Sequence, residues 1–161
     1  MLSDFLQKQA LLARRHVPFR ILTLYHATDR KNVRSIFRDG FHRGDPKGKP
    51  RAFGPFIYFT QHPDKNIRHY LHRKGEAAII VSMVIIANER PTSSDTSTIV
   101  NGTSKAQHTE MPKGHYALYA DVEDDIIWCI DDPALILPVG WCTARLSPTR
   151  TIVRGEIHDR A

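Results

Sequence analysis

The chain has 161 residues, a hydrophobic fraction of 41% and a charged fraction of 25%, which are typical of one soluble globular domain. Its apolar runs fall well short of the ~20 residues that a membrane-spanning helix needs, so we expect no membrane association. The net charge of +6 favours anionic partners, such as nucleotides, nucleic acid or acidic proteins, without selecting among them.

Apolar periodicity and turn residues predict two strand–helix units followed by a strand-rich C-terminal half. In chain order, we expect a helix before residue 18, a strand at 20–27, a short helix ending at residue 39, a strand at 56–60, a helix over 63–74, and strands at 77–87, 115–120, 126–130 and 134–142. Residues 88–114 are polar and turn-rich, and we expect there a long excursion with one short strand at 98–100. This order predicts an α+β fold.

No linker or internal repeat divides the sequence, so we expect a single domain over residues 1–161. Within it we expect an N-terminal helix at 1–19, a core at 20–146 and a C-terminal tail at 147–161. We also expect a monomer.

Short polar residues and glycines mark the expected helix boundaries. Ser3 is placed to cap the first helix, and Thr28 or Asp29 to cap the second, because their side-chain oxygens can accept from the first backbone N–H groups. Gly40 and Gly75 lie where helices should end, and Gly40 suits a left-handed backbone conformation.

Cys129 and Cys142 are the two cysteines of the chain. Two cysteines without paired partners do not form a zinc site, so we expect no metal and interpret both as small buried hydrophobic residues. A nucleophilic pairing of Cys129 with a histidine stays open, because spacing alone does not test it. Asp4 lies in an N-terminal stretch without an unbroken apolar run, so we expect no secretory signal and an intracellular, cytoplasmic or nuclear protein. A secreted effector or toxin stays open.

Taken singly, the residues that could take part in catalysis or binding do not reveal a function. His26 ends a strand, where a histidine is more often structural than catalytic, and Tyr58 alone is a strand aromatic. The basic segment 42–53 has no interleaved aromatic residues of the kind that bind single-stranded nucleic acid. The sequence contains no glycine-rich phosphate-binding motif. Composition and periodicity therefore leave the role of the domain open.

Four motifs, taken in order, are more informative. They are LYHAT at 24–28, DGF at 39–41, GPFIYFT at 54–60 and IIWCIDDPALILP at 126–138. Together they resemble the ADP-ribosyltransferase superfamily, on the poly(ADP-ribose) polymerase side, over residues 22–142. The resemblance implies an ADP-ribosyltransferase-like split mixed or antiparallel sheet, with short flanking helices around an NAD-binding cleft. It also implies NAD+ as the co-substrate.

The first motif is where the resemblance places the adenosine side of the donor. His26 would hydrogen-bond the adenosine ribose of NAD+, and the backbone of Ala27 would hold the nicotinamide amide. Ala27 replaces the family's glycine but keeps the backbone N–H. Thr28 would offer its hydroxyl to the adenine-side ribose.

By the same resemblance, aromatic rings would hold the nicotinamide. Tyr58 and Tyr70 would stack on its two faces, because flat π systems suit an aromatic cation. Asn66 lies one helical turn before Tyr70 and would bond the carboxamide. Segment 42–53 would form a flap over the donor, with basic residues near the pyrophosphate or simply exposed to solvent: Lys47, Lys49 and Arg51.

Two departures shape the expected reaction. Phe56 stands where the family has a glycine close to the ligand, so it should narrow the nicotinamide pocket or turn outward. Ile127 falls at the family's catalytic glutamate, or Ile126 with a one-residue shift, and the His-Tyr-Ile set resembles mono-ADP-ribosyltransferase members. Isoleucine cannot accept a proton. We therefore expect transfer of a single ADP-ribose to a protein or nucleic-acid acceptor, with release of nicotinamide. We interpret residues 123–125 as a solvated turn. The strand period would place Asp125 on the face of Ile127, so the alternative that Asp125 takes over the role of the family's glutamate stays open.

Two other functions stay open. One is a catalytically silent module of the same fold that binds an ADP-ribose-like ligand, RNA or a protein. The other is a tRNA 2′-phosphotransferase, which shares the fold but uses arginines and a second histidine where this chain has Tyr58 and Phe59.

Overall fold

Residues 1–44, 54–64, 71, 75–92, 110–122, 125–146 and 152–159 are described in the computed structural model, and the account below applies to them. Their helices are α1 (Leu2–Arg14) and α2 (Val33–Asp39), with short 3-10 turns η1 (Arg30–Asn32) and η3 (Pro133–Leu135). Their strands are β1 (Phe19–Thr28), β2 (Ile57–Thr60), β3 (Glu76–Ala87), β4 (Glu89–Pro91), β5 (Ala117–Val122), β6 (Asp125–Ile130), β7 (Ile136–Leu146) and β8 (Ile152–Asp159). The α+β class predicted from the sequence is confirmed.

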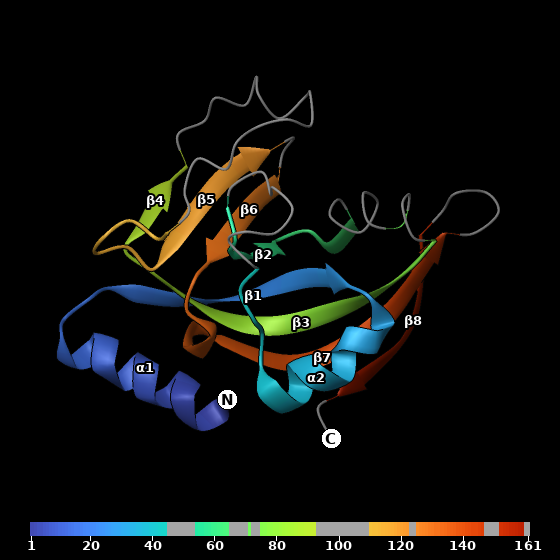
Figure 1. Cartoon of the computed structure of the whole chain (residues 1–161), viewed down its shortest axis with the longest axis horizontal. Helices are drawn as coiled ribbons and strands as arrows, with labels where there is room; N and C mark the ends of the chain where they lie inside the picture. Colours follow the sequence, from blue (N-terminus) through green and yellow to red (C-terminus); the bar gives the residue numbers. More distant parts are fainter. Residues whose placement is uncertain are drawn as a thin grey trace.

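Hydrogen bonds join the strands into one mixed sheet of eight, in the order β4-β5-β6-β2-β1-β3-β7-β8. The β4–β5 pair is parallel and the pairs among the other strands are antiparallel. Figure 1 shows β5 and β6 standing above β1, β3 and β7, which run across the middle of the molecule, with α1 and α2 below them. The sheet therefore has two differently oriented halves.

The junction between the two halves lies between β1 and β2. The backbone register recorded for this pair is Tyr25↔Thr60, whereas the neighbouring pair of β1 with β3 extends from Phe19↔Ala87 to Thr28↔Ala78. The two strands thus touch over a short length and diverge on either side of it. This junction is where the motifs at 24–28 and 54–60 meet.

Helix α1 forms from a stretch whose apolar residues recur on one side. Phe5 and Leu12 are buried in the main core, while Leu6 on the other side of the helix is exposed, as an amphipathic helix requires. The predicted cap at Ser3 is wrong. The helix begins one residue earlier with Met1 as N-cap, and the Ser3 hydroxyl lies inside the helix, where it accepts a hydrogen bond from Gln7 Nε2 at 3.2 Å.

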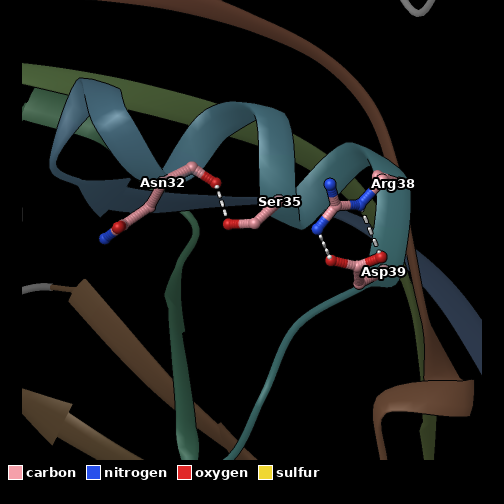
Figure 2. A network of polar contacts seen from close by, with 4 residues as sticks. All are labelled: Asn32, Ser35, Arg38 and Asp39. Atoms are coloured by element: carbon pink, nitrogen blue, oxygen red, sulfur yellow. Dashed lines mark hydrogen bonds and ion pairs between the residues drawn. The ribbon is translucent and has the colours of Figure 1, made fainter.

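The second helix starts as the turn η1 and continues as α2. Asp29 occupies the N-cap of η1, one of the two predicted positions, but no cap bond from its side chain is recorded. Further along, the Ser35 hydroxyl donates to the carbonyl of Asn32 at 2.9 Å, and Arg38 forms a two-pronged pair with Asp39 (Figure 2). The guanidinium of Arg38 lowers the pKa of Asp39, but both groups are solvent-exposed, so the pair contributes little to stability.

Glycine ends α2 as predicted. Gly40 has φ 89° and ψ −178°, a region that residues with a Cβ avoid, and its N–H donates to the carbonyl of Ile36. The chain turns there, and Phe41 enters the core at 4% exposure. Gly75 likewise has a positive φ of 73° and donates to Leu71, in agreement with the predicted helix end.

Apolar side chains cover both faces of the sheet. The main core cluster lies on the helix-bearing face and includes Phe5, Leu12, Ile36, Phe59 and Trp128. Central strand β3 is buried along both faces, as its unbroken apolar run predicted. On the opposite face, a second cluster lies over β3 and β7, and a third lies over β2, β5 and β6.

Two of the less regular segments form strands that the sequence did not predict. Residues 147–161 were expected to be a tail, but β8 within them pairs with β7 from Gly140↔Asp159 to Leu146↔Ile152 and extends the sheet. Residues 88–114 begin with β4, a strand that was not predicted. The short strand expected at 98–100 lies outside the described residues.

Candidate functional site

The three residues that the resemblance assigns to catalysis lie on neighbouring strands. His26 is on β1, Tyr58 on β2 and Ile127 on β6, and the sheet order places β2 between the other two. The register of β2 with β6 is Tyr58↔Cys129 and Thr60↔Ile127. Folding therefore brings three motifs that are far apart in the chain to one part of the sheet.

The His26 ring is held at the junction between β1 and β2. Its Nδ1 lies 2.7 Å from the carbonyl oxygen of Tyr58. Because a carbonyl only accepts, Nδ1 must carry the proton, which leaves Nε2 as the acceptor nitrogen of the neutral ring. The ring also packs edge-on against Phe41 at 5.0 Å and tilted against Phe59 at 5.7 Å between centroids. These contacts define both the tautomer and the orientation of the imidazole.

Tyr58 is partly exposed, and its side chain lies on the sheet face opposite the main core. It packs with the third cluster, while its neighbour Phe59 enters the main core, as strand alternation requires. Its hydroxyl donates to the carbonyl of Gly54, which comes directly before the strand. The hydroxyl thus helps to hold the start of the 54–60 motif.

The side chains of His26 and Tyr58 occupy different faces of the sheet. The partners of the His26 ring, Phe41 and Phe59, belong to the main core, whereas Tyr58 and Ile127 pack at the margin of the third cluster. The His26–Tyr58 contact passes through the Tyr58 carbonyl rather than through its ring. The structure therefore brings Tyr58 and Ile127 onto one face and places the His26 ring at the junction beside it.

The other residues predicted to bind NAD+ are only partly described by the structure. Ala27 is partly buried and packs against the second cluster. Thr28 is 7% exposed, and its hydroxyl oxygen accepts a hydrogen bond from Asn32 Nδ2 at 3.1 Å, so it already has a partner within the fold. Asn66 and Tyr70 lie outside the described residues. So do three basic residues of the expected flap, which are Lys47, Lys49 and Arg51.

Phe56 is fully buried, which excludes the predicted outward orientation. It packs with Leu118 and Cys129 in the third cluster, on the strands that lie away from β1. The Arg43 guanidinium lies over its ring, 5.8 Å from the centroid. Phe56 therefore packs as a core residue of this half of the sheet.

Arg43 and Asp131 were not singled out from the sequence, yet they join the segment after α2 to the end of β6. Arg43 Nε lies 2.7 Å from Asp131 Oδ1, but the contact is an ion pair rather than an aligned hydrogen bond. Partial burial raises the pKa of Asp131, and the charge of Arg43 opposes that rise. Next to Arg43, the N–H of Gly44 donates to the carbonyl of Pro55 at 3.0 Å. Residues 43–44 are thereby held beside the start of β2.

Cys129 lies opposite Tyr58 in the β2–β6 pair, so its ability to act as a nucleophile can be assessed. Its side chain is fully buried in the third cluster, and burial raises the pKa of its thiol. Since the thiolate is the reactive form, this cysteine is unsuited to nucleophilic attack. Cys142 is also buried, as predicted for a small hydrophobic residue.

Ile127 and Asp125 occupy the outer end of the same face. Ile127 is partly exposed and lies opposite Thr60. Asp125 was interpreted as part of a solvated turn, and this is wrong, because it is the first residue of β6 and only 4% exposed. Burial was missed because sequence reasoning took the charge of the residue as evidence of exposure.

Other kinds of site are not indicated by the described residues. Within those ranges, no group of three or more His, Cys, Asp or Glu side chains is placed to bind a metal ion. No helix in the described part of the chain is long and apolar enough to cross a membrane. One surface hollow of about 350 Å³ lies beside Arg20 and Glu89, and another of about 490 Å³ lies along α1 beside Lys8. The first hollow lies outside the four motifs, whereas the second borders the motif at 126–138 through Ala134.

Comparison with known proteins adds no relative. The chain matches no protein-family model and no curated protein. The likeness to ADP-ribosyltransferases therefore rests on the motif residues of the sequence.

Proposed function

We propose that the chain is an NAD+-dependent mono-ADP-ribosyltransferase that transfers one ADP-ribose to a protein or nucleic-acid acceptor. The observation that carries the proposal is the convergence of the three motif residues on adjacent strands, with His26 Nδ1 bound to the backbone of Tyr58. Residues that share one site must lie near one another, and neighbouring strands provide that proximity here.

The geometry gives each residue a chemical role in this proposal. His26, which the resemblance assigns to the ribose of NAD+, has its ring held in place by the contact of Nδ1 with the Tyr58 carbonyl. The partly exposed Tyr58 ring supplies an aromatic surface for the nicotinamide. Departure of nicotinamide proceeds through an oxocarbenium-like state that needs positioning and electrostatic stabilisation rather than a base at Ile127. Transfer of a single unit is thus compatible with an apolar third residue.

Incubation with NAD+ labelled in its adenylate part, together with candidate acceptors, tests the proposal. We expect labelled acceptor and stoichiometric nicotinamide, and a loss of at least about tenfold in both for His26→Ala, as expected for an orienting hydrogen bond. His115→Ala is the matched control, because His115 Nδ1 also contacts a backbone carbonyl, that of Asn88 at 2.8 Å, before β5. An activity of His26→Ala equal to that of the control would contradict the proposal.

A catalytically silent binding module is the second candidate. The apolar side chain of Ile127 on the exposed face favours it, because this position carries no group able to accept a proton. Calorimetry with NAD+ and ADP-ribose separates the two candidates. Micromolar binding without nicotinamide release supports the silent module, whereas steady nicotinamide release supports the transferase.

A further inference from the structure

The side chain of Arg20 forms a flat, supported surface near the start of β1. Its guanidinium lies over the ring of Trp128, 5.6 Å from the ring centroid, and its Nη2 donates to both carboxylate oxygens of Glu89 at 2.9 Å. The Trp128 ring in turn contacts the Tyr119 ring at 5.6 Å between centroids. Contacts from β4, β5 and β6 thus hold the guanidinium in place.

Trp128 contributes to this stack through its ring rather than through its N–H group. The residue is 1% exposed, and its Nε1 has no hydrogen-bond partner in the described part of the chain. A buried donor without an acceptor is costly, so the N–H does not account for a tryptophan at this position. Tryptophan does offer the most favourable ring face for a cation. The arrangement therefore indicates a support for the Arg20 guanidinium.

Arg20 also lines the surface hollow of about 350 Å³ at the start of β1, which we name the Arg20 hollow. Its volume is near the lower end of the ~300–1,000 Å³ that is typical of small-molecule sites. The Arg20 side chain is 55% exposed in spite of its contacts. Since one face of the guanidinium lies over Trp128, the opposite face is available to a second flat group. Apolar side chains supply much of the wall for such a group, namely Pro18, Phe19, Ile86 and Ala87.

Hydrogen-bonding groups lie at the rim of the Arg20 hollow. Asn88 Nδ2 donates to the carbonyl of Gly114 at 3.2 Å, which leaves Oδ1 as an acceptor. The Glu89 oxygens keep accepting capacity, and the guanidinium has further N–H groups on Nε and Nη1. A flat ring with donors and acceptors on its edge fits this combination, whereas a hydrocarbon ring would leave these groups unpaired. Nucleobases have this chemistry, and they stack on arginine guanidinium planes.

The charge of the chain favours a base that is attached to phosphates. The net charge is +6, and exposed arginines flank the hollow along the chain, with Arg14 and Arg15 before Pro18 and Arg90 after Glu89. Basic side chains that neutralise phosphates supply much of the affinity for nucleic acids. A single strand suits the hollow, because the faces of its bases are accessible for stacking.

We propose that the Arg20 hollow binds one base of a single-stranded nucleic acid, which stacks on the guanidinium of Arg20. At ~3.3 Å per residue, Arg20 lies about 20 Å along β1 from His26, so the hollow is separate from the candidate site. The proposal therefore does not depend on transferase activity, and binding is measured without NAD+.

The first test uses the wild type alone. Fluorescence anisotropy compares a labelled oligoadenylate of about ten nucleotides with an oligomer of the same length and backbone that has no bases. The base-bearing strand should bind about tenfold more tightly or better, because stacking adds to the attraction of the phosphates. Higher salt should weaken both affinities while their ratio persists, since phosphate contacts are the salt-dependent part. Adenosine monophosphate should bind at least about tenfold more weakly than the oligoadenylate, because it has a single phosphate.

The second test replaces the flat group and keeps its charge. Arg20→Lys retains a cation that can pair with Glu89 but has no planar face, so the affinity for oligoadenylate should fall about tenfold. Arg38→Lys is the matched control, because Arg38 also forms two hydrogen bonds with a neighbouring acid, Asp39. Among the cation–ring contacts recorded for the described residues, none involves Arg38. This variant should keep the wild-type affinity.

The outcomes separate the proposal from its alternatives. Equal affinities for the strands with and without bases overturn it, as does an affinity of Arg20→Lys equal to that of the control. Adenosine monophosphate that binds as tightly as the oligoadenylate overturns the choice of a nucleic acid as the partner. The comparison of strands on the wild type decides even if Arg20→Lys fails to fold. None of these results changes the standing of the transferase proposal, which is tested by nicotinamide release.

Discussion

Replacement of Phe56 by alanine tests whether this residue is part of the core or a wall of a ligand pocket. The side chain is fully buried and packs with Leu118, Ala120 and Cys129, under the guanidinium of Arg43. Truncation of such a ring removes its apolar burial and leaves a cavity, which together cost about 3–5 kcal/mol. Phe56→Ala should therefore lose a large part of the roughly 5–15 kcal/mol that stabilises a domain.

Urea unfolding followed by tryptophan fluorescence measures this loss, since Trp128 is buried in the main core. With a slope of about 2 kcal/mol per molar, a loss of about 4 kcal/mol moves the midpoint down by about 2 M urea. The melting temperature should fall by about 10 °C. Leu6→Ala is the control, because Leu6 is 51% exposed and such surface changes cost within about 0.5 kcal/mol.

A cost below about 1 kcal/mol for Phe56→Ala would refute the reasoning, because a ring that lines an open pocket leaves no cavity in the core. The Phe56→Gly variant, which restores the residue of the family motif, should be less stable still, since glycine adds about 1 kcal/mol of backbone entropy.

Three further predictions concern single residues. Gly40→Ala should destabilise the chain by about 1–3 kcal/mol in thermal unfolding, because Gly40 has φ 89° and ψ −178°, a backbone conformation that a residue with a Cβ avoids. Unchanged stability of the variant would exclude this backbone conformation. Cys129 and Cys142 should react with an aromatic disulfide reagent only on unfolding, because both are buried and the pKa of the Cys129 thiol is raised. Rapid reaction of Cys129 in the folded protein would contradict its burial. The pKa of Asp131 is raised above 3.8 in the folded chain. The wild type should therefore have its greatest stability relative to Asp131→Asn below pH 3.8, where the carboxyl is protonated. This stability advantage should disappear as the pH rises through the raised pKa. The measurement is the melting temperature of both proteins from acid to neutral pH. If the two curves are parallel throughout, burial of Asp131 does not change the pH dependence of stability.

The elements that sequence reasoning located well have strong local signals. The strand β3 follows from an unbroken apolar run too long to alternate, and β1 from its branched and aromatic residues. The end of α2 follows from Gly40, because the backbone there needs a residue without a Cβ. Such signals depend on the residues themselves and their immediate neighbours.

The two features that were missed depend on contacts that the residue pattern does not reveal. Strand β8 has no apolar pattern as clear as that of β3, and it exists as a strand because the edge of β7 provides hydrogen bonds for it. Ser3 had the right chemistry for a cap, but the helix was extended to Met1, where the terminal amino group pairs with Asp4 at 2.6 Å. For β8 a distant strand decided the structure, whereas at Ser3 the competing contact lies within the same helical turn.

The sequence by itself determined which residues could form the candidate site, because the motifs around His26, Tyr58 and Ile127 are local patterns of residue type and spacing. Only the tertiary structure decided how they meet. Burial of Phe56 and Asp125, and the bond from His26 to the Tyr58 carbonyl, follow from the placement of β2 between β1 and β6. The neighbours of a strand are set by hydrogen bonding and packing across the whole sheet, so no single segment of the chain carries that information.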